Sequence, residues 1–468
     1  MNRTDHSWQP AVFEAAVEVA LTELDRYLRD SEQAREPVVV RRSPAELADR
    51  LDLRRWIAEG GMDPGRLGGF LREYLANSTR LHHPGYLAHQ NAVPHFPAAV
   101  ADLVQGATNS PVSVYEMGPA GATVELAVLD WMLGQVGWDP ATGGGVLTHG
   151  GSAANLTALL AARAQAAPDS WADGVPDDLV LLAPPSAHYS LRRAAAILGL
   201  GERAVYPLVV DGLERIVPAA LEATLAQVRA AGKRPMALVA NAGATSTGLH
   251  DDLVAVGEFC RRHRIWFHVD GAHGASALLA PELRHLLAGV RGADSLVWDA
   301  HKMLRVAGLC AGVLLRDRTH LMGAFRQRAE YLLYGDPHSG VDLMERSLEC
   351  SKSALGLRLF LNLAWHGEAG LGEYVARRYR LAREFHALIS ARPGFECPYQ
   401  PESNILCFRY RGSDQDQVDL RQRLLAQGRF HLSSTTVAGR RYLRLVVMSP
   451  TTTAADIQEL LTAVERAG

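Results

Sequence analysis

The sequence predicts an α/β protein with a mostly parallel central sheet flanked by helices, followed by a small α+β domain. From about residue 140, short apolar runs alternate with amphipathic segments, a pattern typical of parallel strands joined by helical crossovers. After about residue 356, a long helical segment precedes apolar runs that indicate antiparallel strands. The 468 residues suffice for about three ordinary domains, or fewer if one is a large α/β unit.

The first 80 residues are expected to form short helices. Residues 11–30 carry apolar side chains at helical spacing, Ser43 and Glu46 match a capping box, and residues 62–77 continue in amphipathic pieces. These helices contain few core residues and should pack on another surface. We therefore predict that residues 1–80 are a helical segment that packs on a partner subunit.

Residues 81–355 are predicted to be the large domain. Its expected strands are GGVLTHGG, DLVLLAPP, MALVANAG, IWFHVDG and DSLVWDAH, and its expected helices include SAANLTALLAARAQAA and HDDLVAVGEFCRRH. In a sheet of this kind, ligands bind at the carboxyl ends of the strands. Polar residues at those ends are therefore the candidate site.

Residues 356–468 are predicted to be a small C-terminal domain. The segment LGLRLFLNLAWHGEAGLGEYVARRYRLAREFHALIS favours a long helix, ESNILCFRYR and RRYLRLVVMS favour antiparallel strands, and TAADIQELLTAVERAG favours a closing helix. No internal repeat is visible in the chain.

Composition excludes several classes of function. The formal net charge is −3, and no basic run is interleaved with aromatic residues, so nucleic acid is not an expected partner. The first residues lack a secretory apolar segment, and no apolar stretch is long enough for a membrane span. The five cysteines are widely spaced and form no metal-binding pattern. We expect a cytoplasmic protein without a membrane partner or a bound metal.

Two residues at consecutive strand ends indicate the chemistry. Asp270 ends IWFHVD, and Lys302 follows SLVWDAH, a separation of 302 − 270 = 32 residues that allows one crossover. Both side chains can therefore reach one crevice. Pyridoxal 5′-phosphate (PLP) requires such a pair, because a lysine amine holds the cofactor as a Schiff base and a carboxylate keeps its ring nitrogen protonated.

Two further elements support a PLP site. In residues 148–160 a strand ends, Gly150 and Gly151 turn the chain, and a helix begins near Ser152, so its N-terminus can bind a phosphate. His188 follows the strand DLVLLAPP and can stack on the cofactor ring or relay a proton. Each element is weak alone, but their order and placement together predict PLP binding.

At these residues the chain resembles the group II PLP-dependent decarboxylases, which include the aromatic-amino-acid, glutamate, cysteine-sulfinate and 2,4-diaminobutyrate decarboxylases. The most specific part is IWFHVDGAHGASALLAPELRHLLAGVRGADSLVWDAHKML, and the resemblance covers roughly residues 80–468. It implies PLP fold type I, the aspartate aminotransferase-like architecture. It also implies a homodimer with active sites at the subunit interface.

The resemblance implies a role for each matching residue. Catalytic roles fall on the Schiff-base residue Lys302, its neighbour His301, the ring-nitrogen partner Asp270 and the ring-stacking His188. Cofactor contacts fall on Gly151, Ser152, Ala153 and Asp299 near the phosphate, Thr245 near the 3′-oxygen or the carboxylate, and Ala272 under the ring. Substrate contacts fall on His89, Gln90, Asn91 and the carboxylate-pairing Arg444.

The chain departs from the family pattern in two places. Ala300 and Met303 flank the His-Lys pair where the family often has proline and tryptophan, and we expect changes in packing only. The second departure is in the catalytic loop, residues 328–350, which we expect to reach the partner's active site. This loop lacks the expected tyrosine shortly before ECSK, and the nearest candidates for the proton donor are His338, Tyr334 and Tyr331.

The predicted function is PLP-dependent decarboxylation of an L-amino acid to a primary amine and CO₂, with an acidic, aspartate- or glutamate-like substrate favoured by Gln90, Asn91 and Arg444. Alternatives are a diaminobutyrate-type substrate, an aminoacyl group tethered to a carrier protein, and oxidative deamination to an aldehyde. An aminotransferase, a desulfurase and a non-catalytic binding protein are further alternatives. His188 favours simple decarboxylation, and intact Lys302 and Asp270 favour an enzyme.

Overall fold

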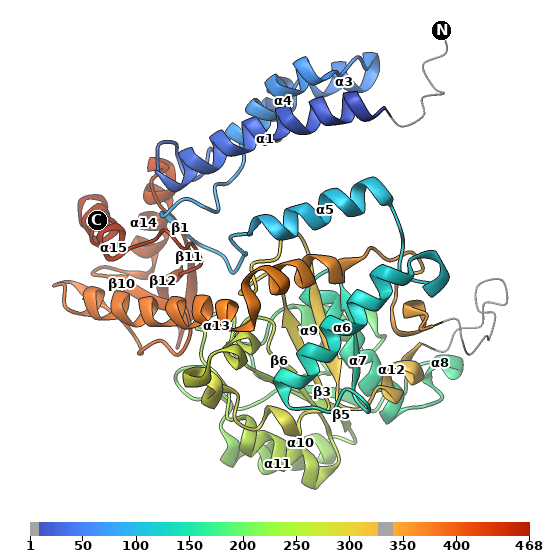
Figure 1. Cartoon of the computed structure of the whole chain (residues 1–468). Helices are drawn as coiled ribbons and strands as arrows, with labels where there is room; N and C mark the ends of the chain where they lie inside the picture. The colour runs from blue at the N-terminus through green and yellow to red at the C-terminus, as the bar shows by residue number, and fades with distance from the viewer. Residues whose placement is uncertain (1–8, 326–339) are drawn as a thin grey trace.

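The computed structural model describes residues 9–325 and 340–468. A large unit built around a seven-stranded sheet adjoins a smaller unit built around a five-stranded sheet, and an arm of N-terminal helices extends from them (Figure 1). None of the helices in these ranges combines the length and apolar character needed to span a membrane.

The N-terminal arm consists of four helices: α1 (Pro10–Glu32), α2 (Pro44–Arg50), α3 (Leu53–Glu59) and α4 (Pro64–Ala76). The predicted capping box is confirmed, because the Glu46 N–H donates to Ser43 Oγ at 3.2 Å and the Ser43 N–H donates to Glu46 Oε2 at 2.7 Å. Helices α1 and α4 lie side by side, and Arg72 of α4 donates to the buried Glu23 of α1 at 2.7 Å.

The large sheet is mostly parallel, as predicted. Its strands are β2 (Gly144–Thr148), β3 (Leu179–Ala183), β4 (Val205–Pro207), β5 (Arg234–Asn241), β6 (Trp266–Asp270), β7 (Ser295–Asp299) and β8 (Ala311–Leu315), in the order β2-β8-β7-β6-β5-β3-β4. The sequence did not predict β4 or β8. Strand β8 is antiparallel to both neighbours, because the short link 300–310 after β7 leaves no room for a crossover.

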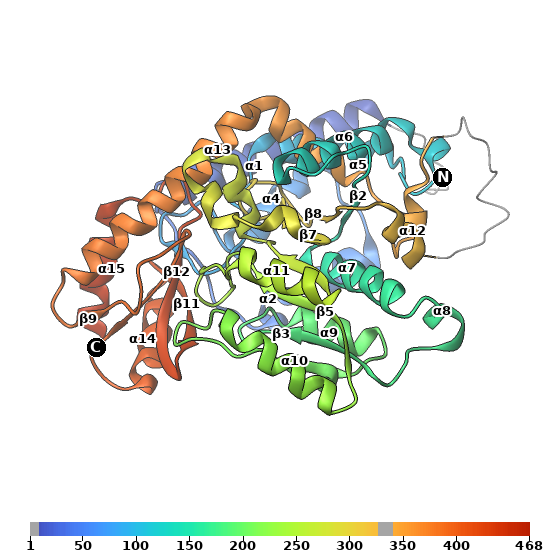
Figure 2. The ribbon, with the colours of Figure 1, turned by 90° about the horizontal axis from the view of Figure 1, so that it is seen from below.

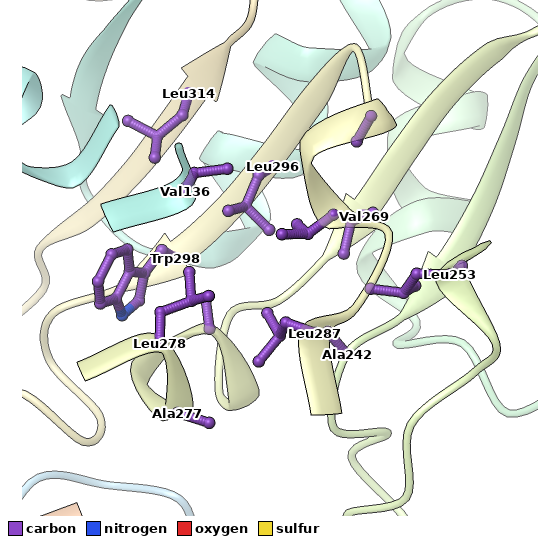
Figure 3. Packing of buried hydrophobic residues seen from close by; sticks show 14 of the residues in the cluster. Val136, Ala242, Leu253, Val269, Ala277, Leu278, Leu287, Leu296, Trp298 and Leu314 are labelled. Carbon is purple, nitrogen blue, oxygen red and sulfur yellow. The ribbon is translucent and has the colours of Figure 1, made fainter. Parts of the chain in front are cut away.

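Helices cover both faces of this sheet (Figure 2). One face carries α6 (Pro119–Val136), α10 (Leu221–Ala230) and α11 (Leu253–His263), and the other carries α7 (Gly151–Ala166), α9 (Ser190–Ile197) and α12 (Thr319–Ala324). Strand residues alternate between the two cores: Leu296 and Trp298 pack on the α6 side (Figure 3), whereas Val297 packs on the α7 side. Helices α5 (Phe96–Thr108) and α8 (Ser170–Asp173) complete this unit.

The smaller unit contains β1 (Tyr86–Leu87), β9 (Phe395–Glu396), β10 (Ile405–Tyr410), β11 (His431–Val437) and β12 (Arg440–Val446), with α13 (Leu355–Ser390), α14 (Asp414–Gln427) and α15 (Ala454–Ala467). The predicted strands β10 and β12 are antiparallel neighbours. The predicted long helix α13 is kinked at Gly367, whose φ is +66°. Strand β1 pairs with β11, so the segment 81–355 adds a short strand to this sheet.

Candidate active site

A cavity of about 340 Å³ lies where β5, β6 and β7 end and α7 begins. It brings together ten predicted residues: Asn91, Gly151, Ser152, His188, Thr245, Asp270, Ala272, Asp299, His301 and Lys302. This placement follows from the parallel sheet, because the carboxyl ends of neighbouring strands meet at one edge.

Lys302 is the lysine of this cavity. The chain contains three lysines. Lys233 donates to Asp177 O on the surface, and Lys352 is fully buried in an ion pair with Glu125. Only Lys302 lines the cavity, with its Nζ 3.3 Å from Asp299 Oδ2. Of the three amines, it alone is placed to hold a carbonyl cofactor there.

Asp270 ends β6 as a buried carboxylate, 8% exposed. Its Oδ2 accepts a hydrogen bond from Asn155 Nδ2 at 3.1 Å, and its Oδ1 accepts one from the Ala272 N–H at 3.2 Å. Donors to both oxygens fix the orientation of this carboxyl group. Asp270 can therefore supply a fixed negative charge to a protonated ring nitrogen.

The start of α7 forms an anion site at the same cavity. Gly150 has φ +98°, a conformation that favours glycine, and the helix begins at Gly151. A Cβ on Gly151 would lie 2.8 Å from Asp299 Oδ2, so a larger residue would displace the Asp299 side chain. Among the described residues, no side chain caps α7. Its first N–H groups and positive dipole end are therefore suited to a phosphate.

Two of the predicted cavity residues are histidines, His188 and His301. His188 lies just before α9, and its Nδ1 is 2.8 Å from Ser190 Oγ. Burial lowers the pKa of His188, although the charge of Asp270 opposes this shift, so the ring is neutral near pH 7. His301 Nε2 lies 3.6 Å from Asp299 Oδ2.

Four predicted residues do not line the cavity. Ala153 lies in the first turn of α7, and His89 is exposed and stacks edge-on against His431. Gln90 and Arg444 lie together in the smaller unit, where Arg444 Nη2 donates to Gln90 Oε1 at 3.2 Å.

Residues that the sequence did not single out also line the cavity: His149, Asn155, Tyr189, Asn241, Gly243, His273 and Leu309. Asn155 had a detectable signal, because it lies three residues after Ser152 and so on the same face of α7. His273 had a weaker one, because it follows Asp270 within the most specific motif.

The two departures from the family pattern have different outcomes. Ala300 and Met303 are fully buried in the core, as expected for changes in packing. Tyr331, Tyr334 and His338 lie outside the described residues, as does the loop 328–350 up to residue 339.

The model of the pyridoxal-dependent decarboxylase conserved domain matches residues 71–411 of this chain. The chain belongs to this decarboxylase family. Human acidic amino acid decarboxylase GADL1 is 30% identical over 448 residues, covering 91% of this chain and 85% of the human protein. Rat cysteine sulfinic acid decarboxylase is 31% identical over 95% of this chain and 94% of the rat protein. Pig aromatic-L-amino-acid decarboxylase is 32% identical, covering 79% of each. The crystal structure of mouse CSAD in apo form superposes with a TM-score of 0.91 at 28% identity. The superposition covers 98% of this chain and 99% of the mouse chain.

These relationships confirm fold type I and a PLP-dependent amino acid decarboxylase, a carboxy-lyase. The cofactor is PLP, and the cavity of this decarboxylase fits it in three respects. The uncapped start of α7 suits the phosphate, the buried Asp270 suits the ring nitrogen, and Lys302 supplies the amine.

Proposed function

We propose that this decarboxylase converts an L-amino acid with an acidic side chain, of the aspartate, glutamate or cysteine sulfinate type, into a primary amine and CO₂. The observation that carries the proposal is a buried arginine beside the cavity that, with a neighbouring glutamine, keeps a donor without an acceptor among the described residues. Arginine is suited to a carboxylate or a sulfinate, because its guanidinium presents several N–H groups in a planar fork.

Arg444 on β12 is 6% exposed. Its Nη1 donates to Ala88 O and Ser433 Oγ, each at 3.1 Å, and its Nη2 donates to Gln90 Oε1. Among the described residues, Arg444 Nε and Gln90 Nε2 are buried without a hydrogen-bond acceptor. Two neighbouring buried donors, one of them charged, favour an anionic group that satisfies them when bound.

The charge of Arg444 acts on the cavity itself. Burial, followed by the charge of Lys302 and then by that of Arg444, lowers the pKa of the cavity residue His273 to about 3. Asn91, next to Gln90 in the chain, also lines the cavity. An amino acid held near Lys302 can therefore direct a negatively charged side chain toward Arg444.

Relatives named for acidic substrates are among those that match this chain. The human and rat proteins are named for acidic amino acids and cysteine sulfinic acid, and they match over 91% and 95% of this chain. The pig protein, named for aromatic amino acids, matches over 79%. Because relatives of both kinds match, the acidic assignment rests on the surroundings of Arg444.

In this proposal each cavity residue has a separate task. When bound, PLP accepts the electron pair that the bond to CO₂ leaves behind. Asp270 holds the proton on the ring nitrogen, the start of α7 binds the phosphate with Gly151 and Ser152, and Ala272 leaves room for the ring. Lys302 would supply the amine that holds the cofactor.

Replacing Arg444 by methionine should lower kcat/KM for an acidic substrate by about 10- to 100-fold, because a charge-assisted hydrogen bond contributes about 1.5–3 kcal/mol. Steady-state kinetics with aspartate, glutamate, cysteine sulfinate and an aromatic amino acid would measure this loss. Arg409→Met is the matched control, because Arg409 is equally buried in the same sheet but pairs with Asp414.

The loss should be confined to acidic substrates and should leave PLP affinity unchanged. An equal loss for acidic and aromatic amino acids would instead assign Arg444 to the α-carboxylate, which all substrates share. Activity with a diaminobutyrate-type or carrier-tethered substrate alone would also overturn the acidic assignment.

We also propose that the enzyme is a homodimer. Four apolar residues at helical spacing, Phe96, Val100, Leu103 and Val104, form a stripe along α5, and each is 44–49% exposed. The ring of Phe96 packs edge-on against Trp365 of α13, itself 64% exposed, which widens this surface. An apolar surface of this kind is typical of a protein–protein interface.

The arm α1–α4 lies on the same side of the molecule as α5 (Figures 1 and 2). It also exposes large apolar side chains, among them Leu21 at 60% and Ile57 at 85%. Both surfaces become buried if a second copy of the chain packs against them. This agrees with the predicted packing of residues 1–80 on a partner; the cytoplasmic location stays a prediction.

Val100→Glu should convert the dimer into monomers, because the interface cannot bury a carboxylate without a partner. Analytical ultracentrifugation measures the change directly. Val209→Glu is the control, because Val209 is 52% exposed and lies away from the α5 stripe. An unaltered protein that sediments as a monomer with full activity would contradict the dimer.

A further inference from the structure

Three side chains on β6 face α7 because alternate residues of a strand point to the same side. They are Trp266, His268 and Asp270, and all are buried. Asn155 of α7 contacts two of them: its Nδ2 lies 3.1 Å from Asp270 Oδ2, and its Oδ1 lies 2.9 Å from His268 Nε2. Ser295 of β7 lies beside His268 in the sheet.

The direction of each hydrogen bond around Asn155 can be assigned from its partners. A carboxylate only accepts, so Asn155 must turn its amide nitrogen toward Asp270. The second N–H of that nitrogen is directed to Ser190 Oγ at 3.0 Å. Asn155 Oδ1 is therefore the acceptor of its hydrogen bond with His268. The donor must be His268 Nε2, which therefore carries a hydrogen.

From His268 the hydrogen-bond network extends away from the cavity. Burial lowers the pKa of His268, so the ring is neutral and its Nδ1 is an acceptor. Ser295 Oγ lies 2.8 Å from that Nδ1 and accepts the Trp266 indole N–H, also at 2.8 Å. The Ser295 hydroxyl therefore donates to His268.

From Asn155 the hydrogen-bond network also extends toward the cavity, as far as His188. The Ser190 N–H donates to His188 Nδ1 at 3.3 Å, so that nitrogen is unprotonated. Ser190 Oγ accepts a hydrogen bond from Asn155 Nδ2, and its own O–H donates to the same Nδ1 at 2.8 Å. The neutral His188 ring therefore carries its proton on Nε2.

We propose that Asn155 is a positioning residue that couples Asp270 to His188, and that His268 and Ser295 fix the orientation of its amide. The correctly oriented amide gives one N–H to the Asp270 carboxylate and, through Ser190, presents His188 with Nε2 protonated. A reversed amide would place Oδ1 against Asp270 and deprive Ser190 of its donor. This inference rests on the PLP site of the proposed function, but not on the identity of the substrate.

The proposal assigns a role to residues remote from the cofactor. His268 and Ser295 do not line the cavity, yet they determine which atom of Asn155 faces it. His188 becomes a hydrogen-bond donor at Nε2, suited to holding an acceptor atom of the bound substrate or cofactor. A neutral ring in this tautomer is a poor proton donor, so the proton delivered to Cα must come from another group.

NMR of the enzyme labelled with ¹⁵N in its histidines tests the assigned protons directly. His188→Asn and His268→Asn identify the two rings by the signals that disappear. We expect both rings to be neutral with the proton on Nε2. A proton on Nδ1 of either ring would overturn the proposal.

The coupling itself is tested by Asn155→Asp, which keeps the shape but replaces both N–H groups by an oxygen. Two carboxylates then face each other, so PLP should bind at least about tenfold more weakly. The absorbance spectrum of the bound cofactor should also change. Asn362→Asp is the control, because Asn362 is fully buried and donates to Leu304 O at 3.1 Å outside this network. Equal effects of the two variants would contradict the coupling.

If the Asn155→Asp variant does not fold, two milder serine substitutions test the same coupling. Ser295 and Ser276 are both fully buried, and each accepts an indole N–H at 2.8 Å, from Trp266 and Trp298 respectively. Ser295→Ala should shift the His268 ¹⁵N signals and the cofactor absorbance, whereas Ser276→Ala should change neither. Identical spectra for the two variants would contradict the proposal. All of these measurements are made without substrate, so their outcome is independent of the acidic-substrate assignment.

Discussion

Replacing Lys302 by alanine is expected to abolish both the covalent binding of PLP and the release of CO₂. The chain has no other lysine at the cavity, because Lys233 is on the surface and Lys352 is fully buried against Glu125. The expected loss of kcat is at least about 10³-fold, because one side chain supplies both the covalent attachment and a titratable amine. Visible absorbance of the purified protein and a CO₂ assay measure the two effects.

Lys233→Ala is the matched control, since it removes a lysine that donates to Asp177 O on the surface. Borohydride reduction followed by peptide mapping should locate the cofactor on Lys302 in both the unaltered enzyme and this control. A cofactor recovered on another lysine, or activity retained by Lys302→Ala, would overturn the assignment of the site.

Replacing Lys352 by methionine is expected to destabilise the protein by about 3–5 kcal/mol, because it leaves a buried carboxylate without its counter-ion. Lys352 Nζ lies 2.6 Å from Glu125 Oε2, and both side chains are 0% exposed. The other oxygen of Glu125 accepts the Leu147 N–H of β2 at 3.0 Å, so the pair ties the segment that follows the catalytic loop to the large sheet. Denaturant unfolding at fixed protein concentration measures the change.

The double variant Glu125→Gln/Lys352→Met should recover much of this stability, because neither charge is then left buried alone. Arg440→Met is the control, since its pair with Glu396 is about half exposed on each side and screened by water. A midpoint for Lys352→Met equal to that of Arg440→Met would show that the buried pair does not stabilise the fold.

Five strands of the large sheet could be predicted because each is a short apolar run followed by a turn. Asp270 and Lys302 could be assigned to one cavity because parallel strands bring their carboxyl ends to one edge. Strand β8 escaped prediction because its antiparallel return depends on the length of a link, not on an apolar pattern. Strand β1, only two residues long, gains its partner β11 from a segment more than 300 residues away.

The substrate side of the site was harder to predict. Asn91 lies at the cavity, but the neighbouring Gln90 faces Arg444 in the smaller unit, because the chain bends through residues 88–90. The network around Asn155 was missed because its members come from two helices and two strands. No spacing in the chain predicts which of their atoms meet.

The most direct test of the account is CO₂ release by the PLP-loaded enzyme across a panel of free L-amino acids, with the organic product identified by mass spectrometry. We predict CO₂ and the corresponding primary amine from an acidic amino acid, in equal amounts and without peroxide. An aldehyde with peroxide would indicate oxidative deamination and contradict the proposed product. No CO₂ from any acidic amino acid, with the cofactor still bound to Lys302, would contradict the proposed substrate.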